Sequence, residues 1–262
     1  MTPLLVILAG VLIGLSLGTL GAGGAILTVP VLVYLAGQGA HEATTGSLVI
    51  VGATCLIALI PHARRGGVRV RPALPFAALG TVGSVIGSRG NAHIPPALLL
   101  SGFALLLLGV GILMLRTSLA GPAPAEPEST DRVPPVARSG LLKLILVAAA
   151  VGLLTGFFGV GGGFALVPAL VLLVGLPMPH AIGTSLLIIT LNSATALVAR
   201  ADRLADLDWG LIGALLAVTA VASILGTRLS SRLSATTLTR TFAMLLLVVG
   251  TGIAAVNLPA IG

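Results

Sequence analysis

Charged residues are scarce in this chain. Only 8% of its 262 residues are Asp, Glu, Lys or Arg, and 56% are hydrophobic, whereas about 25% charged residues is usual for a soluble globular domain. The mean hydropathy is +1.16. This balance excludes a soluble globular domain and predicts an all-α polytopic membrane protein.

Acidic residues are missing from the apolar runs. All seven fall between those runs: Glu42, Glu126, Glu128, Asp131, Asp202, Asp206 and Asp208. A buried carboxylate that could relay protons through the membrane is therefore not expected. Two forms of transport remain open. One is facilitated diffusion driven by the substrate gradient and the membrane potential, and the other is proton coupling through the substrate itself or a histidine.

The basic excess has a different meaning here than in a soluble protein. The net charge is +7 and the pI is about 11.5, which in a soluble domain would suggest nucleic acid as a partner. Nearly all the Lys and Arg residues lie in loops and at helix ends, where cytoplasmic arginines orient the helices of a membrane protein. The expected partners are therefore the lipid bilayer and a small anionic substrate, and no nucleic acid.

The residues needed for catalysis or metal binding are also few. The single cysteine, Cys55, excludes an intrachain disulfide. The serine of a G-x-S-x-G match at 14–18 lies within an apolar run without a nearby histidine and acid, and the histidines show no metal-ligand spacing. We therefore expect no enzyme, no metal and no cofactor. The histidines are His41, His62, His93 and His180.

Apolar runs account for most of the chain. Most have the ~17 to 25 residues that a membrane-spanning helix needs, and two of them are about half that length. The first ten residues lack a basic segment, so we expect a retained first helix and no cleaved signal. The runs lie at 3–20, 25–36, 43–61, 72–88, 96–115, 141–158, 164–175, 181–199, 210–227 and 237–256.

One stretch occurs twice. Residues 14–37 read GLSLGTLGAGGAILTVPVLVYLAG, and residues 152–175 read GLLTGFFGVGGGFALVPALVLLVG, aligned without a gap. In each copy an apolar helix meets a cluster of glycines, breaks, and resumes as a short helix that contains Pro30 or Pro168. A broken helix at membrane depth is costly unless its freed backbone groups line a cavity or are buried in protein. The two glycine clusters are therefore candidate site elements.

The duplication predicts two transmembrane repeats, 1–116 and 140–262, of about four to five apolar segments each. They are joined by a proline-rich cytoplasmic linker at 117–139. Secondary transporters are commonly built from such repeats, with a site at the repeat interface near the middle of the membrane. Residues 4–37 would span ~51 Å as one helix, so a fold back at the glycines, which makes the repeats inverted, is favoured over a straight crossing, which makes them parallel.

The candidate substrate-binding residues are the two glycine clusters and the polar residues on the helices that follow them. Helix starts and bare glycine amides favour an anion, and no Lys or Arg lies deep enough to bind one as a point charge. By contrast, Gly10, Gly14 and Gly18 form a small-residue stripe that predicts close helix packing. The candidates are Gly21, Gly23, Gly24, Thr45, Ser47, Gly159, Gly161, Gly162, Gly163, Thr184, Ser185 and Asn192.

These motifs carry a resemblance to a known family. The doubled glycine stretch, AIGTSLLIITLNSATA after its second copy, and the later pieces around Asp208-Trp209 and at 225–229 resemble the sulfite exporter TauE/SafE family of membrane transporters. The first half departs by reading Thr45-Gly46-Ser47 where the second reads Gly183-Thr184-Ser185. The resemblance implies a multi-pass protein of the bacterial cytoplasmic membrane that transports a small sulfur oxyanion or organosulfonate, such as sulfite or sulfoacetate.

Two alternatives use the same sequence features. An anion channel would share the polar lining but would show flux too fast for a carrier and no counterflow. A non-transporting membrane scaffold would tolerate bulky and polar substitutions at both glycine clusters. A homo-oligomer, the direction of transport and the coupling ion are left open by the sequence.

Overall fold

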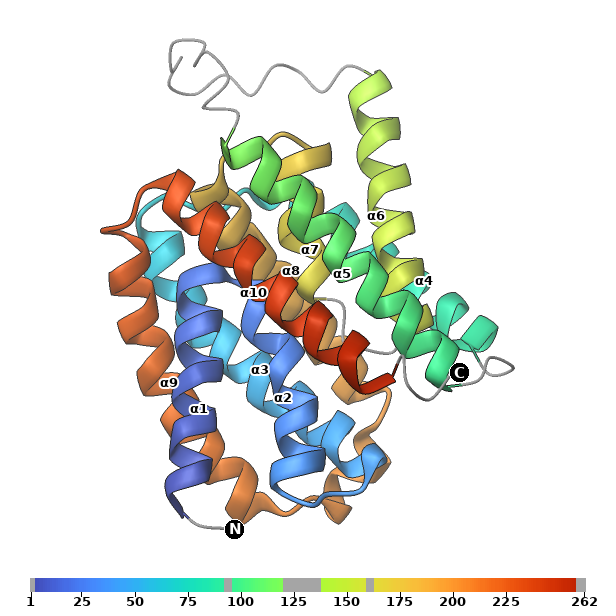
Figure 1. The fold of residues 1–262 in the computed structure, drawn as a ribbon, viewed down its shortest axis with the longest axis vertical. Coiled ribbons are helices and arrows are strands. Elements are labelled where there is room, and N and C mark those ends of the chain that lie inside the picture. Colours follow the sequence, from blue (N-terminus) through green and yellow to red (C-terminus); the bar gives the residue numbers. More distant parts are fainter. Residues whose placement is uncertain (1–2, 92–95, 120–137, 159–162, 258–262) are drawn as a thin grey trace.

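The chain folds into a bundle of helices (Figure 1). A computed structural model describes residues 3–91, 96–119, 138–158 and 163–257, and no strand occurs in these ranges. The helices are α1 (Pro3–Leu20), α2 (Ala25–Pro30), α3 (Ala40–Arg64), α4 (Val70–Asn91), α5 (Pro96–Leu119), α6 (Arg138–Phe158), α7 (Gly163–Pro168), α8 (Met178–Val198), α9 (Trp209–Ser230) and α10 (Ala235–Asn257).

Each predicted apolar run is helical, and the two half-length runs share one local design. α2 ends at Pro30 and continues as a π-helix over Val31–Leu35, and α7 ends at Pro168 and continues as a π-helix over Ala169–Leu173. Proline has no N–H to donate to the carbonyl four residues earlier. The wider turns that follow restore hydrogen bonds, such as those from Ala36 N to Val31 O and from Val174 N to Ala169 O, each 3.0 Å.

The chain reverses direction at the first glycine cluster. Gly21 has φ +72°, which only glycine adopts easily, and a single 3-10 turn over Ala22–Gly24 follows. Gly24 then packs directly on Ile13 and Leu17 of α1. The short helix α2 therefore returns alongside α1, and residues 4–37 do not form one long helix.

Four helix pairs build the bundle. α1 packs along α9, α6 along α4, α3 along α8 and α5 along α10. In the first pair a Cβ on Gly18 would overlap the carbonyl oxygen of Ser223, and one on Gly14 that of Thr219. The prediction that Gly10, Gly14 and Gly18 are packing glycines is confirmed, since all three face α9.

The two ends of the bundle differ in charge. Four exposed arginines lie where α3 passes into α4: Arg64, Arg65, Arg69 and Arg71. The start of α8, the end of α9 and the start of α10 lie at this same end, and we call it the arginine-bearing end (Figure 1). The starts of α1, α3 and α9 lie at the opposite end. Most of the proline-rich linker predicted at 117–139 lies outside the described residues. Its two predicted ends fall within helices, because α5 continues to Leu119 and α6 begins at Arg138.

The outer surface is suited to lipid. Large apolar side chains are exposed on the outside of several helices, including Leu105 (70%), Val248 (68%) and Val221 (63%). Among the described residues five helical segments are long and apolar enough to cross a membrane: Glu42–Arg64, Ser101–Leu119, Met178–Val198, Trp209–Ser230 and Ala235–Ala255. Such a surface would promote aggregation in water but is the normal one in a bilayer.

Candidate functional site

The first glycine cluster meets α8 at one hydroxyl. A Cβ on Gly21 would lie 2.6 Å from Ser185 Oγ and 3.2 Å from the carbonyl oxygen of Ile182. Ser185 is fully buried, and its Oγ donates to the Ile182 carbonyl at 2.8 Å. The reversal of the chain and the predicted hydroxyl are therefore in direct contact, although 164 positions separate them in the sequence.

The other two glycines of this cluster face apolar neighbours. A Cβ on Gly23 would lie 2.9 Å from Leu245 on α10, and Gly24 packs on Ile13 and Leu17 of α1. Of the three predicted glycines in the first cluster, Gly21 is the one at which an added Cβ would meet a polar side chain among its nearest neighbours. The Gly24 carbonyl accepts from Thr28 Oγ1 of its own helix at 3.2 Å. The bare amides of Gly23 and Gly24 are thus held in a close-packed setting.

The second glycine cluster is only partly within the structure. Gly159, Gly161 and Gly162 lie outside the described residues, and Gly163 is the first residue of α7. The turn Ala22–Gly24 contacts α7, and so does α2. The short helix of each doubled stretch therefore lies beside that of the other.

The hydroxyls of α3 and α8 lie toward opposite ends of the bundle. The two helices are antiparallel, because Gly52 packs on Ser193 while Gly67, beyond the end of α3, packs on Gly183 near the start of α8. Thirteen helical residues then separate the levels of Ser47 and Ser185, about 20 Å at ~1.5 Å per residue. Thr45 and Ser47, both buried, do not share one cluster with Thr184 and Ser185.

Two polar contacts occupy the middle of the bundle. Thr54 Oγ1 on α3 lies 2.9 Å from Thr219 Oγ1 on α9. Thr81 Oγ1 on α4 donates to Asn192 Oδ1 on α8 at 3.4 Å. Thr81 and Thr219 were not among the predicted site residues, and their signal is a lone hydroxyl near the centre of an apolar run.

Asn192 on α8 and Thr54 on α3 each share a helix face with a serine. Ser185 and Asn192 are seven residues apart on α8, and Ser47 and Thr54 are seven apart on α3. A spacing of seven residues returns to the same face of a helix, two turns along. Both helices therefore carry a polar side chain at mid-depth and another two turns closer to one end.

A row of buried hydroxyls on α9 was also missed. Thr219, Ser223 and Thr227 recur every four residues and are fully buried. Ser223 Oγ donates to Ala220 O at 2.8 Å and Thr227 Oγ1 to Ser223 O at 2.9 Å, so these two satisfy themselves on their own helix. Their four-residue spacing is visible in the sequence, but only the structure shows that the backbone at these three residues packs against Gly14 and Gly18 of α1.

The central threonine contact yields a prediction of small effect. Replacing Thr54 or Thr219 with valine should lower stability by about 0.6 kcal/mol, the average for an interhelical hydrogen bond in a membrane. The double variant should lose less than the sum of the single losses, because both remove the same contact. Unfolding in denaturing detergent measures these losses, with Thr251→Val on the exposed face of α10 as a control. Strictly additive losses would contradict a direct contact.

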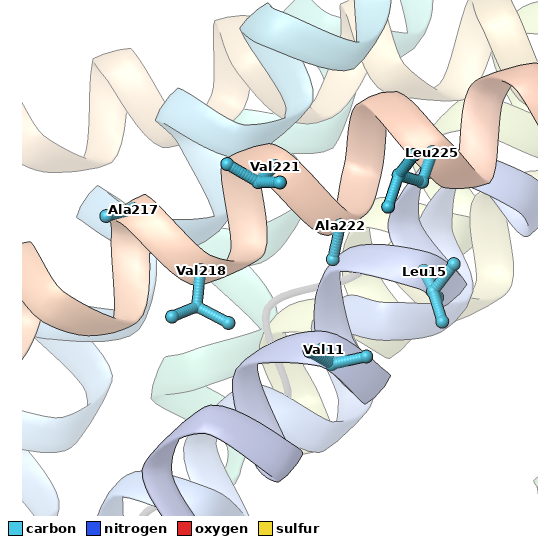
Figure 2. Close-up of a pocket in the computed structure, with 7 residues that line it drawn as sticks. All are labelled: Val11, Leu15, Ala217, Val218, Val221, Ala222 and Leu225. Atoms are coloured by element: carbon cyan, nitrogen blue, oxygen red, sulfur yellow. The ribbon is translucent and has the colours of Figure 1, made fainter. Parts of the chain in front are cut away.

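An apolar groove lies between α1 and α9 (Figure 2). Every side chain that lines it is apolar: Val11, Leu15, Ala217, Val218, Val221, Ala222 and Leu225. Val221 and Leu225 are more than half exposed. A hollow without polar groups cannot hold an anion, so this groove suits a lipid chain and is not part of the predicted site.

The fold and the buried polar residues together define a class. A helical bundle with an apolar outer surface, membrane-length helices and a helix broken at buried glycines is a polytopic membrane protein of the transporter type. The chain belongs to the sulfite exporter TauE/SafE family, whose model matches residues 6–253. No group of three or more His, Cys, Asp or Glu that could hold a metal occurs in the described part of the chain.

Known relatives carry transporter names. A probable membrane transporter protein of Xylella fastidiosa is 37% identical over 246 residues, covering 92% of this chain and 90% of the relative. The probable membrane transporter protein YdhB of Bacillus subtilis is 28% identical over 187 residues, covering 71% and 74%. A probable membrane transporter protein of Methanocaldococcus jannaschii, MJ0441, is 26% identical over 202 residues, covering 75% and 71%. No solved structure is a significant match.

Proposed function

We propose that this protein is a secondary carrier that moves a small anion, a sulfur oxyanion or an organosulfonate, across the prokaryotic cytoplasmic membrane. The class of substrate follows from the description of the family. The polar residues inside the bundle agree with it, because they offer hydroxyls, an amide and backbone N–H groups. No Asp, Glu, Lys or Arg among the described residues lies in the middle of a helix. An anion held only by dipoles is bound weakly and released easily.

The observation that carries the proposal is the placement of the polar side chains on α3 and α8. Ser185 and Asn192 lead from the arginine-bearing end to mid-depth on one helix, and Ser47 and Thr54 lead from the opposite end to mid-depth on the other. Asn192 and Thr54 lie at about the same level, because Gly52 of α3 packs on Ser193 of α8, and each makes a polar contact there, with Thr81 and Thr219 respectively. A substrate could thus pass from one row to the other near the middle of the membrane.

The candidate residues take different roles in this proposal. Those near the arginine-bearing end, Gly21, Thr184 and Ser185, bind the anion from that side. Thr45, Ser47 and Gly163 bind it from the opposite side. Gly159, Gly161 and Gly162, which lie outside the described residues, keep the anion-binding role that the sequence predicts for them. Gly23 and Gly24 hold the first reversal in shape, and Asn192 binds at mid-depth.

We further propose that the two halves are inverted repeats that rock against each other. In the two repeats α1 corresponds to α6, and α4 corresponds to α9. Inverted repeats therefore require that α6 pack on α4 as α1 packs on α9, and both pairs are in contact. The reversal at Gly21 gives the first half five passes, and an odd number of passes inverts the second half. Most described arginine side chains then lie on one side, which the positive-inside rule assigns to the cytoplasm.

A carrier is favoured over a channel because the described part of the path is closed. Gly21, Thr184 and Ser185 are buried, and the Ser185 hydroxyl is engaged with its own helix. A channel needs a continuous opening between the two sides, whereas a carrier passes through closed states during each cycle.

Counterflow in proteoliposomes tests the function. Vesicles loaded with unlabelled sulfite should accumulate labelled sulfite transiently, and sulfoacetate, sulfate and small carboxylates should be tested in parallel. Flux without counterflow would indicate a channel. Absence of flux with every anion of the panel would contradict the proposal.

Removing the Ser185 hydroxyl should weaken substrate binding. Ser185→Ala deletes one hydrogen-bonding group, worth about 1 kcal/mol, so we expect the half-saturating concentration to rise about fivefold. Asn192→Ala should raise it by a similar factor. Thr195→Ala on the exposed side of the same helix is the matched control and should leave it unchanged. Equal kinetics in all four proteins would contradict the site.

A further inference from the structure

The connection between α3 and α4 covers the first turns of α8. A Cβ on Gly183 would lie 2.5 Å from the carbonyl oxygen of Gly67, which is a direct contact of two backbones. Arg69 N donates to Thr184 Oγ1 at 3.0 Å. The residues beneath this connection are Thr184 and Ser185, so it closes the proposed site at the arginine-bearing end.

An arginine and a histidine meet on top of this closure. Arg69 Nη2 lies 3.3 Å from His180 Nε2. His180 precedes Thr184 by one helical turn and therefore lies on the same side of α8. The guanidinium is always protonated and has five N–H donors, so in this contact His180 Nε2 is the acceptor. Arg69 is exposed and keeps donors available one turn above the first hydroxyl of the path.

The opposite end carries acidic groups in the corresponding places. Glu42 lies in the first turn of α3, as His180 lies in the first turn of α8. Asp208 precedes α9, as Arg69 precedes α4, and its carboxylate caps that helix by accepting from Leu211 N at 3.1 Å. Both acids are exposed. At these matching places a small anion is attracted by Arg69 and repelled by Glu42 and Asp208. Arg200, just beyond the end of α8, also lies at the opposite end.

We propose that Arg69 and His180 form an anion-receiving site that binds a small oxyanion before it reaches Thr184 and Ser185. This inference rests on the proposed function. The oxygens of the anion take guanidinium N–H groups in place of His180 Nε2, as bidentate pairing with arginine allows. Thr184 Oγ1 is the acceptor in its contact with the Arg69 amide, so its O–H is the group that donates to the anion as the anion moves inward.

The test compares removal of two arginines at the same end. Arg69→Gln should raise the half-saturating sulfite concentration about tenfold when sulfite is applied to the arginine-bearing face, because a charge-assisted hydrogen bond is lost. Applied to the other face, sulfite should show little change. Arg232→Gln removes an equal charge from the exposed connection between α9 and α10 and should have little effect. Membrane vesicles of both orientations provide the two faces.

The outcomes separate this inference from the proposed function. Equal shifts in the two variants would reduce the effect to surface potential and overturn the receiving site, and so would an unchanged Arg69→Gln protein. If the wild type shows no flux, the rise in melting temperature caused by sulfite measures binding alone. A rise that Arg69→Gln loses and Arg232→Gln keeps supports the receiving site, and no rise in the wild type overturns it. Should Arg69→Gln fail to fold, Arg69→Lys takes its place, with a smaller shift expected because lysine cannot pair bidentately.

Discussion

Gly21→Ala is expected to abolish transport, whereas Gly37→Ala should leave it nearly intact. Both glycines have positive φ, +72° and +69°, so alanine introduces backbone strain of about 1 to 3 kcal/mol at either position. The difference lies in their surroundings. A Cβ on Gly21 would meet Ser185 Oγ at 2.6 Å, and nothing lies within 4 Å of one on Gly37. Counterflow and the melting temperature of both variants measure the two effects separately.

A second substitution checks the cause of the Gly21 effect. In the double variant Gly21→Ala, Ser185→Ala the hydroxyl that the new methyl group would meet is gone, so part of the lost stability should return. Transport should return only in part, to no more than the level of Ser185→Ala, because a Cβ on Gly21 would still lie 3.2 Å from the carbonyl oxygen of Ile182. If Gly21→Ala and Gly37→Ala behave alike, the contact between Gly21 and α8 has no functional importance.

Gly18→Leu should prevent assembly of the folded protein. A Cβ on Gly18 would overlap the carbonyl oxygen of Ser223 and lie 2.9 Å from Thr227 N. These are backbone atoms that cannot move without separating α1 from α9, and overpacking of this kind costs at least 1 to 3 kcal/mol. Chromatography in mild detergent should show loss of the monodisperse species.

Gly213→Leu is the matched control for Gly18→Leu. Gly213 is exposed on α9, and nothing lies within 4 Å of a Cβ built there. The same change of side chain should therefore leave the protein monodisperse and active. A monodisperse, active Gly18→Leu protein would contradict the close approach of α1 and α9.

The sequence placed helices and breaks well because these depend on local properties. Hydrophobic length identified the apolar runs, and the glycines with the following proline located the interruption after α1. The interruption predicted at the second glycine cluster lies largely outside the described residues. The sequence could not place the hydroxyls of α3 and α8 relative to each other. Ser47 and Ser185 occupy matching positions in the doubled sequence, yet the antiparallel packing of α3 and α8 separates their levels by about 20 Å at ~1.5 Å per residue.

Other functional candidates had no sequence signal strong enough to find them. The sequence gives His62 no motif that distinguishes it, and it lies in the last turn of α3. It is nevertheless buried, with Nε2 3.5 Å from the carbonyl oxygen of Gly18. Arg69 likewise reads as an ordinary loop cation. Its importance arises because the connection between α3 and α4 packs on α8. Local composition does not predict such contacts between distant segments.

The sequence alone determined that this is a helical membrane protein of a transporter family. A chain with so few charges and such long apolar runs folds in a lipid bilayer and not in water, and the doubled glycine motif is specific to the family. The tertiary structure alone decided which polar groups meet. A transmembrane helix can present any of its faces to its neighbours without changing its hydropathy. The contact of Gly21 with Ser185, the central threonine and asparagine pairs, and the approach of Arg69 to Thr184 are therefore set by helix packing.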